Sequence, residues 1–75
     1  MANRIYKEVS PAERPVLDLM ARGMADKEIA RVIGVAPGTV KNQVKSILRK
    51  MNAQNRTQAV AMFLAPHLFQ KKENP

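Results

Sequence analysis

Three basic side chains in the middle of the chain, Lys41, Lys45 and Arg49, stand four residues apart. On an α-helix this spacing places them along one line, and Asn42 and Ser46 are expected to face outward beside them. A helix fits the major groove of B-DNA, where Lys and Arg donate to guanine and Asn forms a paired contact with adenine. The pattern indicates a helix that reads base pairs, to be weighed against an ordinary solvated face, which is the commoner origin of a basic line.

The charge distribution favours a nucleic-acid partner over a solvated face. The 75 residues carry a net charge of +7, with six bases and five acids in residues 1–40 but seven bases and no acid in residues 41–72. Solvated helical faces usually pair their bases with acids, and here no acid alternates with the bases. Such asymmetry is typical of a protein that binds a polyanion, most often nucleic acid. With aromatic residues at only 4%, the chain lacks a base-stacking platform, so duplex DNA is favoured over single strands.

The basic line belongs to the second of two helical patterns, residues 26–33 and 37–51, that together predict a helix-turn-helix. Asp26 is expected to cap the first pattern. Between the two, Gly34 is expected to adopt the left-handed conformation that ends a helix, and Val35 to fold back onto the core. The apolar positions at helical spacing in the first pattern are Ile29, Ala30 and Ile33. Those of the second are Val40, Val44, Ile47 and Met51, with Leu48 at their margin.

The start of the second helix offers a place for a phosphate. Free backbone N–H groups and the helix dipole favour an anion at this end of a helix. Gly38 and Thr39 occupy this position, and the missing side chain of Gly38 lets the backbone approach a phosphate closely. Both residues are therefore expected to contact the DNA backbone.

A shorter helix is expected before this pair. Ser10 is a capping residue, and Glu13 completes a capping box three positions later. Pro15, one turn inside, forfeits the hydrogen bond of an N–H group, which predicts a kinked or delayed first turn. Gly23 is expected to end this helix. Its apolar positions are Val16, Leu17, Leu19, Met20 and Ala21.

A fourth helix is expected after Asn55, which serves as its cap with Gln58 at the capping-box position. The predicted core face consists of Val60, Phe63 and Leu64. The predicted outer face consists of Gln58, Ala61, Met62 and Ala65. Small residues around a flexible methionine suit close helix pairing, so this outer face is interpreted as a dimer interface, against the plainer interpretation of unremarkable surface.

Three motifs, KEIA, GTVK and NRTQAV, match one known family, and Glu13, Leu17 and Gly23 stand at its most characteristic positions. From residue 9 to residue 60 the chain thereby resembles the DNA-binding domain of LuxR-type, or GerE-like, bacterial transcription regulators. The resemblance implies an all-α, four-helix helix-turn-helix domain. Its third helix, residues 37–51, would be the recognition helix, and its fourth would form the contact of a homodimer.

The resemblance also assigns roles to individual positions. It implies base contacts from Lys41, Asn42 and Lys45. It implies phosphate contacts from Lys27, Thr39, Ser46 and Arg49 and, as a weaker candidate, Arg56. Two departures from the family pattern bear on these contacts. Ala36 replaces a Ser or Thr, which removes a cap from the recognition helix, and Gln43 stands where His is frequent.

The sequence as a whole predicts a regulator in the cytoplasm, associated with the nucleoid, that binds duplex DNA and has RNA polymerase as a further partner. Residues 1–9 are expected to form an arm or linker, 10–65 the DNA-binding domain and 66–75 a basic tail. The chain has no cysteine and one histidine, His67, so no metal, cofactor, catalytic pair or small-molecule ligand is expected. The longest apolar run, residues 59–65, is too short to span a membrane.

Two other functions are compatible with parts of this pattern. The last domain of a sigma factor shares the EIA and GTVK motifs and would bind promoter DNA as a monomer, but NRTQAV and the uncharged fourth helix count against it. A protein-interaction module that antagonises a larger regulator is the third interpretation. The salt dependence of duplex binding separates this module from the DNA-binding interpretations.

Overall fold

The structure is a computed structural model that describes residues 8–68 of the chain. The helices are α1 (Arg14–Ala21), α2 (Asp26–Ile33), α3 (Pro37–Met51) and α4 (Arg56–Leu64), followed by the 3-10 helix η2 (Pro66–Leu68). The described range contains no strand, so the predicted all-α class with four helices is confirmed. Residues 1–7 of the expected arm and residues 69–75 of the expected tail lie outside the described residues.

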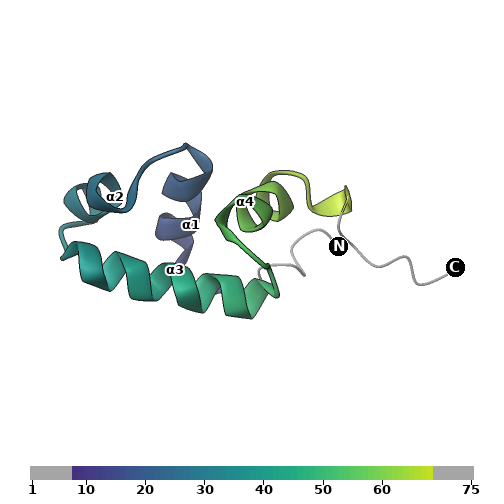
Figure 1. Cartoon of the computed structure of the whole chain (residues 1–75), viewed down its shortest axis with the longest axis horizontal. Coiled ribbons are helices and arrows are strands. Elements are labelled where there is room, and N and C mark those ends of the chain that lie inside the picture. Colours follow the sequence, from purple (N-terminus) through teal and green to yellow (C-terminus); the bar gives the residue numbers. More distant parts are fainter. Residues whose placement is uncertain (1–7, 69–75) are drawn as a thin grey trace, which may run out of the picture.

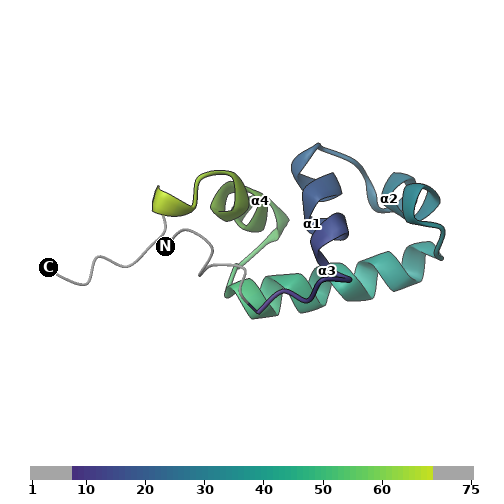
Figure 2. The same cartoon turned by 180° about the vertical axis from the view of Figure 1, so that it is seen from behind.

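The long helix α3 is the base on which the other helices rest. Helices α1, α2 and α4 all lie on one side of α3, with α2 near its N-terminal end and α4 near its C-terminal end (Figures 1 and 2). Helix α2 packs chiefly against α3, whereas α1 packs against α4 and α3. The opposite side of α3 is therefore left uncovered by the other three α-helices.

A single hydrophobic core fills the space between α3 and the three helices that rest on it. Leu17 of α1, Ile29 of α2 and Ile47 of α3 are fully buried there. The predicted inward positions of α3 are confirmed, since the buried side chains of this helix are Val40, Val44, Ile47 and Met51. Val9, which the sequence places in the arm, is only 1% exposed, so the core begins one residue before the predicted domain boundary.

The start of α1 combines the predicted capping box with a delayed helix. The Glu13 N–H donates to Ser10 Oγ at 3.2 Å, and the Ser10 N–H donates to Glu13 Oε1 at 3.0 Å. A turn over residues 11–13 precedes the helix, which begins only at Arg14 and has Pro15 in its first turn. Proline is tolerated there because an N–H in the first turn has no partner within the helix. The capping box and the delayed start are both confirmed.

Both predicted glycine stops are confirmed. Gly23 and Gly34 have φ values of +84° and +87°, in the left-handed region that glycine adopts without steric cost. After α2, the N–H groups of Gly34 and Val35 both donate to the Ala30 carbonyl oxygen, at 2.7 and 3.0 Å, which closes the helix. The expected return of Val35 to the core is wrong, since its side chain is exposed. The turn lies at the edge of the domain, past the last side chains of α2 that reach the core.

The N-terminal end of α2 differs from the prediction. Ala25 is the capping residue and Asp26 is the first helical residue, so the assignment of Asp26 as the cap is wrong. The Glu28 carboxylate accepts the Ala25 N–H at 2.8 Å and satisfies this end of the helix from within. The Asp26 carboxylate is bonded to Arg56 of α4 instead. Ile33, placed by the sequence on the core face, is exposed because it lies in the last turn of a short helix at the domain edge.

Asn55 caps α4 as predicted, but the Gln58 side chain accepts a hydrogen bond from a different residue than expected. Asn55 Oδ1 accepts the Gln58 N–H at 2.8 Å, as expected for a capping asparagine. Gln58 Oε1 accepts the N–H of Gln54 at 2.6 Å, one residue before the cap, and not the Asn55 N–H that a capping box would use.

The inward face of α4 is rotated relative to the predicted one. Ala59 is fully buried, and Val60, Met62 and Phe63 pack partly against the core, whereas Leu64 is 64% exposed. The predictions that Leu64 faces the core and that Met62 lies on the outer face are therefore wrong. Helix α4 packs against both α1 and α3, and Ala59 is the buried side chain of this helix.

Candidate nucleic-acid interface

The uncovered side of α3 carries the three side chains predicted to contact base pairs and one, Arg49, predicted to contact a phosphate. Lys41, Asn42, Lys45 and Arg49, here called the basic face, are all exposed. They point away from the core because the buried residues of α3 occupy the opposite side of the same helix. This side of α3 faces away from α1, α2 and α4 (Figure 1). Since α3 contains no acidic residue, no acid within this helix neutralises the basic face.

The N-terminal end of α3 is open. Ala36 occupies the capping position and offers no side-chain hydrogen bond, as expected from the missing hydroxyl. Gly38 and Thr39 are exposed. A Cβ atom added at Gly38 would meet nothing within 4 Å, so a phosphate could approach the backbone there without a clash. The structure thus places both residues where the sequence predicted a backbone contact to DNA.

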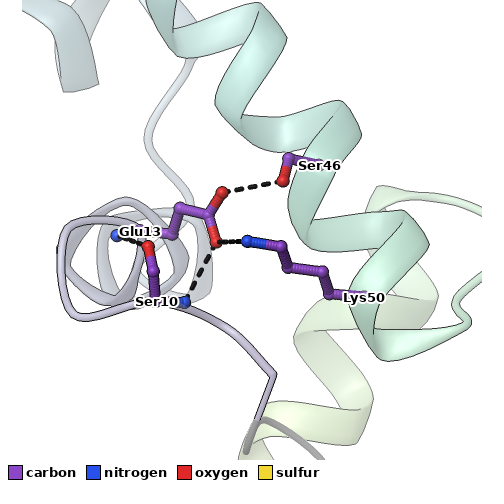
Figure 3. A network of polar contacts seen from close by, with 4 residues as sticks. All are labelled: Ser10, Glu13, Ser46 and Lys50. Atoms are coloured by element: carbon purple, nitrogen blue, oxygen red, sulfur yellow. Dashed lines mark hydrogen bonds and ion pairs between the residues drawn. The ribbon is translucent and has the colours of Figure 1, made fainter.

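Ser46 is turned away from the basic face, contrary to the prediction that it faces outward. Its hydroxyl donates to Glu13 Oε2 at 2.7 Å (Figure 3). One turn further along α3, Lys50 Nζ forms an ion pair with Glu13 Oε1 at 2.9 Å (Figure 3). Because the Glu13 carboxylate at the start of α1 lies within reach, the Ser46 hydroxyl forms its hydrogen bond inside the protein. These contacts join α3 to the start of α1.

The Glu13 carboxylate is held ionised by these neighbours. Its side chain is only 11% exposed. Burial alone would raise the pKa of Glu13, but hydrogen bonds from Lys50, Ser46 and the Ser10 backbone, together with the charge of Lys50, outweigh it and lower the pKa from 4.5 to about 2. Folding therefore favours the ionised form of the Glu13 carboxyl group over the protonated form.

Folding stability is expected to fall as the pH decreases from the ordinary pKa of Glu13, 4.5, towards its folded value of about 2. The lowered pKa contributes stability that is fully present above 4.5 and is lost on acidification, and it amounts to at most about 3 kcal/mol. Urea unfolding at a series of pH values between these limits measures this loss. Glu13→Gln should lack this part of the pH dependence, and an equal loss in both proteins would contradict the assignment.

Arg56, the weaker candidate for a phosphate contact, is engaged inside the domain. Its guanidinium forms an ion pair with Asp26 at 2.6 Å and donates to the Met24 carbonyl oxygen at 3.0 Å. These bonds tie the start of α4 to the start of α2. Lys27, the neighbouring candidate on α2, is exposed. Of these two candidates, the structure leaves Lys27 open to a phosphate and uses Arg56 to hold two helices together.

Gln43, where the family frequently has His, lies at the boundary between the core and the surface of α3. Its Oε1 atom is buried and has no hydrogen-bond partner in the described part of the chain. A buried acceptor without a partner costs about 1–3 kcal/mol. Because this oxygen is buried, it does not belong to the exposed basic face.

The ion pair between Lys50 and Glu13 is the contact that sequence reasoning missed. Glu13 was assigned to the capping box and to a characteristic position of the family, and Lys50 to no role, although Lys50 follows Ser46 by one helical turn and so shares its side of α3. Within residues 8–68 no group of three or more His, Cys, Asp or Glu side chains could hold a metal ion. In the same range, no helix has the length and apolar character needed to cross a bilayer.

Comparison with known proteins identifies the family of this fold. The family described as bacterial regulatory proteins, luxR family (GerE), matches residues 7–63. The chain is 39% identical over 59 residues to transcriptional regulatory protein DesR of Bacillus subtilis, which covers 75% of this chain and 30% of DesR. It is 35% identical over 66 residues to the nitrate/nitrite response regulator protein NarL of Escherichia coli, covering 88% of this chain and 31% of NarL.

The two-component response regulator PprB of Pseudomonas aeruginosa is 34% identical over 70 residues, covering 93% of this chain and 25% of PprB. The chain thus spans between 25% and 31% of the length of these three relatives. The resemblance noted from the sequence motifs is confirmed. Because the family match extends over most of the described residues, the chain belongs to the luxR family of bacterial regulatory proteins.

Proposed function

We propose that this domain regulates transcription by binding duplex DNA, with α3 as the recognition helix in the major groove. The observation that carries the proposal is the exposure of the basic face on the one side of α3 that no other described helix covers. On this basis Lys41 and Lys45 donate to guanine, and Asn42 makes a paired contact with adenine. The buried residues of α3 determine which side of this helix is exposed.

Phosphate contacts are proposed from exposed groups that flank the basic face. Arg49 lies at one end of this face, and Gly38 and Thr39 lie at the N-terminal end of the same helix. Lys27 adds a cation from α2. Ser46 and Arg56 are left out because their polar groups are bonded inside the domain.

Affinity for duplex DNA should fall steeply as salt is raised. Each phosphate that the protein neutralises releases counterions, so the log-log slope of affinity against salt concentration is about −0.9 per phosphate. With Lys27, Arg49 and the lysines of the basic face available, we expect a slope that corresponds to several phosphates. Fluorescence anisotropy of a labelled duplex across a salt series measures this slope. Affinity that is flat in salt would contradict DNA binding and favour the protein-interaction module.

We further propose that two copies pair through the outward side of α4, on a two-fold related DNA site. Ala61 and Leu64 lie on the side of α4 opposite the buried Ala59, and Ala65 directly follows the helix. Leu64 was not in the predicted interface, but it is the large exposed apolar side chain of this face. Of the predicted set, Met62 packs partly against the core, and Gln58 uses its amide oxygen on a neighbouring N–H.

Leu64→Glu should weaken the dimer without unfolding the domain. Leu64 is exposed in the single chain, whereas in the proposed dimer two glutamates would be buried near each other. The expected loss of at least ~2 kcal/mol corresponds to a roughly 30-fold weaker dimer. Sedimentation at a concentration where the wild-type protein is dimeric gives the mass.

Val32→Glu is the matched control, because Val32 is 60% exposed on α2, outside the proposed interface, and receives the same substitution. Its dimer should be unaffected. Equal masses for the wild-type protein and both variants would remove α4 from the interface.

RNA polymerase as a further partner and the nucleoid as the place of action are proposed as consequences of this function. A regulator bound beside a promoter acts on transcription through contacts with the polymerase or by blocking its access. Co-sedimentation of the protein–duplex complex with RNA polymerase distinguishes the two modes.

A further inference from the structure

We propose that Glu13 is a specificity-determining residue of DNA binding, because it fixes the rotation of α3 and keeps the Lys50 ammonium away from DNA phosphates. Glu13 lies beside the flank of α3 that carries Ser46 and Lys50 and acts through these two residues, so it is a positioning residue. The proposal rests on the duplex binding proposed above.

The carboxylate holds α3 at two points. Glu13 Oε2 accepts from Ser46 at 2.7 Å, and Glu13 Oε1 accepts from Lys50 at 2.9 Å (Figure 3). These two partners are one helical turn apart on the same side of α3, so two bonds to one carboxylate oppose rotation of the helix about its axis. A rotation would move every side chain of the basic face relative to the base pairs.

The Glu13 carboxylate is itself held in place by a residue that precedes α1. Glu13 Oε1 also accepts the Ser10 N–H at 3.0 Å, and the Glu13 N–H donates to Ser10 Oγ. The capping box therefore does more than start a helix, since it aims the carboxylate at α3. The chain joins these groups across 33 and 37 residues of sequence, which makes the contact a tertiary one.

The same contact removes a cation from the DNA-binding surface. The Lys50 side chain is 31% exposed and directly follows Arg49, a proposed phosphate contact. Attraction between a lysine and phosphates is independent of sequence and adds equally to binding at every site. Pairing Lys50 with Glu13 therefore lowers binding to all duplexes alike and leaves a larger share of the affinity to the base contacts of α3.

Glu13→Gln tests the proposal, because the amide keeps the shape of the side chain and loses its charge. The preferred duplex is first selected from a random pool with the wild-type protein, and a scrambled duplex serves as the comparison. We expect the variant to bind the scrambled duplex more tightly, with a salt slope steeper by up to about 0.9, which is roughly eightfold in affinity for each tenfold fall in salt. The ratio of preferred to scrambled affinity should decrease.

Asp18→Asn is the matched control. Asp18 lies on α1, and its substitution gives the same change in net charge, but its carboxylate pairs with Arg22, four residues further along the chain, at 3.1 Å. This variant should leave the slope and the ratio unchanged. If both variants shift alike, a general charge effect explains the result and the proposal is wrong. If Glu13→Gln weakens both duplexes equally at an unchanged slope, Glu13 has only a structural role.

If circular dichroism shows that Glu13→Gln is unfolded, Lys50→Met tests the proposal in its place. A lysine withheld from phosphates contributes nothing to the slope, so this variant should keep the wild-type value. A slope reduced by about 0.9 would show that Lys50 contacts a phosphate and would overturn the proposal. If the wild-type protein itself binds no duplex, the proposed function fails and the role of Glu13 in specificity fails with it. If it binds and only the variants disagree, the proposed function stands.

Discussion

Lys41→Ala should weaken binding to the preferred duplex by roughly 5- to 150-fold, since a good contact to a base edge contributes about 1–3 kcal/mol. Lys41 is exposed near the N-terminal end of α3, and the N-terminal residues of a recognition helix contact base edges. Its substitution removes a donor to guanine together with one positive charge. The loss should be largest at the base pair that Lys41 contacts, so substituted duplexes at that position should bind the variant almost equally.

Arg49→Ala provides the comparison, because it removes one charge from the same face two helical turns further on. As a phosphate contact, Arg49 should contribute equally to all sequences, and its loss should reduce the salt slope by about 1 without changing the base preference. Titration of both variants against the preferred duplex and its single-position substitutions separates the two roles. If both variants lost affinity evenly over every duplex, the assignment of Lys41 to a base contact would be wrong.

The bounds of α3 and both glycine stops were predictable because they depend on neighbouring residues in the sequence. A run of apolar residues at helical spacing must be buried on one side, and Val40, Val44 and Ile47 are buried as that spacing requires. The backbone at Gly34 needs a positive φ, which few other residues adopt at low cost. The exposure of the basic face then follows, because the opposite side of the same helix is buried in the core.

The direction of side chains at the edge of a helix face was not predictable in this way. Ser46 lies between the inner and outer sides of α3, and only the presence of Glu13, 33 residues earlier, decides that it turns inward. Arg56 is likewise free on a helical wheel and is bonded in the structure, because Asp26 of α2 lies 2.6 Å away. Such contacts depend on how α1, α2 and α4 are placed on α3. The spacing of apolar residues within one helix does not predict this placement.

The rotation of α4 was mispredicted for a related reason. Large apolar side chains were assigned to the core, which favoured Leu64 over Ala59. In the structure Ala59 is fully buried and Leu64 is exposed. A close-packed core can accept a small side chain and leave a large one outside, so the size of the apolar side chains alone predicts the wrong face. The exposed Leu64 is, for this reason, a stronger candidate for the dimer interface than Met62.

Ile47→Ala should cost about 2–5 kcal/mol of folding stability, because it removes most of a fully buried side chain and leaves a cavity. The free energy of unfolding of a domain of this size is only about 4–11 kcal/mol, so this one substitution removes a large part of it. Ile47 lies on the inner side of α3, between the two residues that Glu13 holds, and makes no proposed contact to DNA. The variant should therefore lose duplex affinity in proportion to its unfolded fraction and keep the wild-type base preference.

Urea unfolding followed by circular dichroism measures this cost, and duplex binding at low temperature, where more of the variant is folded, measures the preference. Ile47→Val should cost only about 0.5–1.5 kcal/mol, since it removes a single methylene group. Val32→Ala, at an exposed position of α2, should change stability by no more than about 0.5 kcal/mol. A base preference that changed in folded Ile47→Ala would show that the core side of α3 also positions the basic face on DNA. A cost no larger than that of Ile47→Val would mean that α3 is held to the domain mainly by its polar contacts with α1.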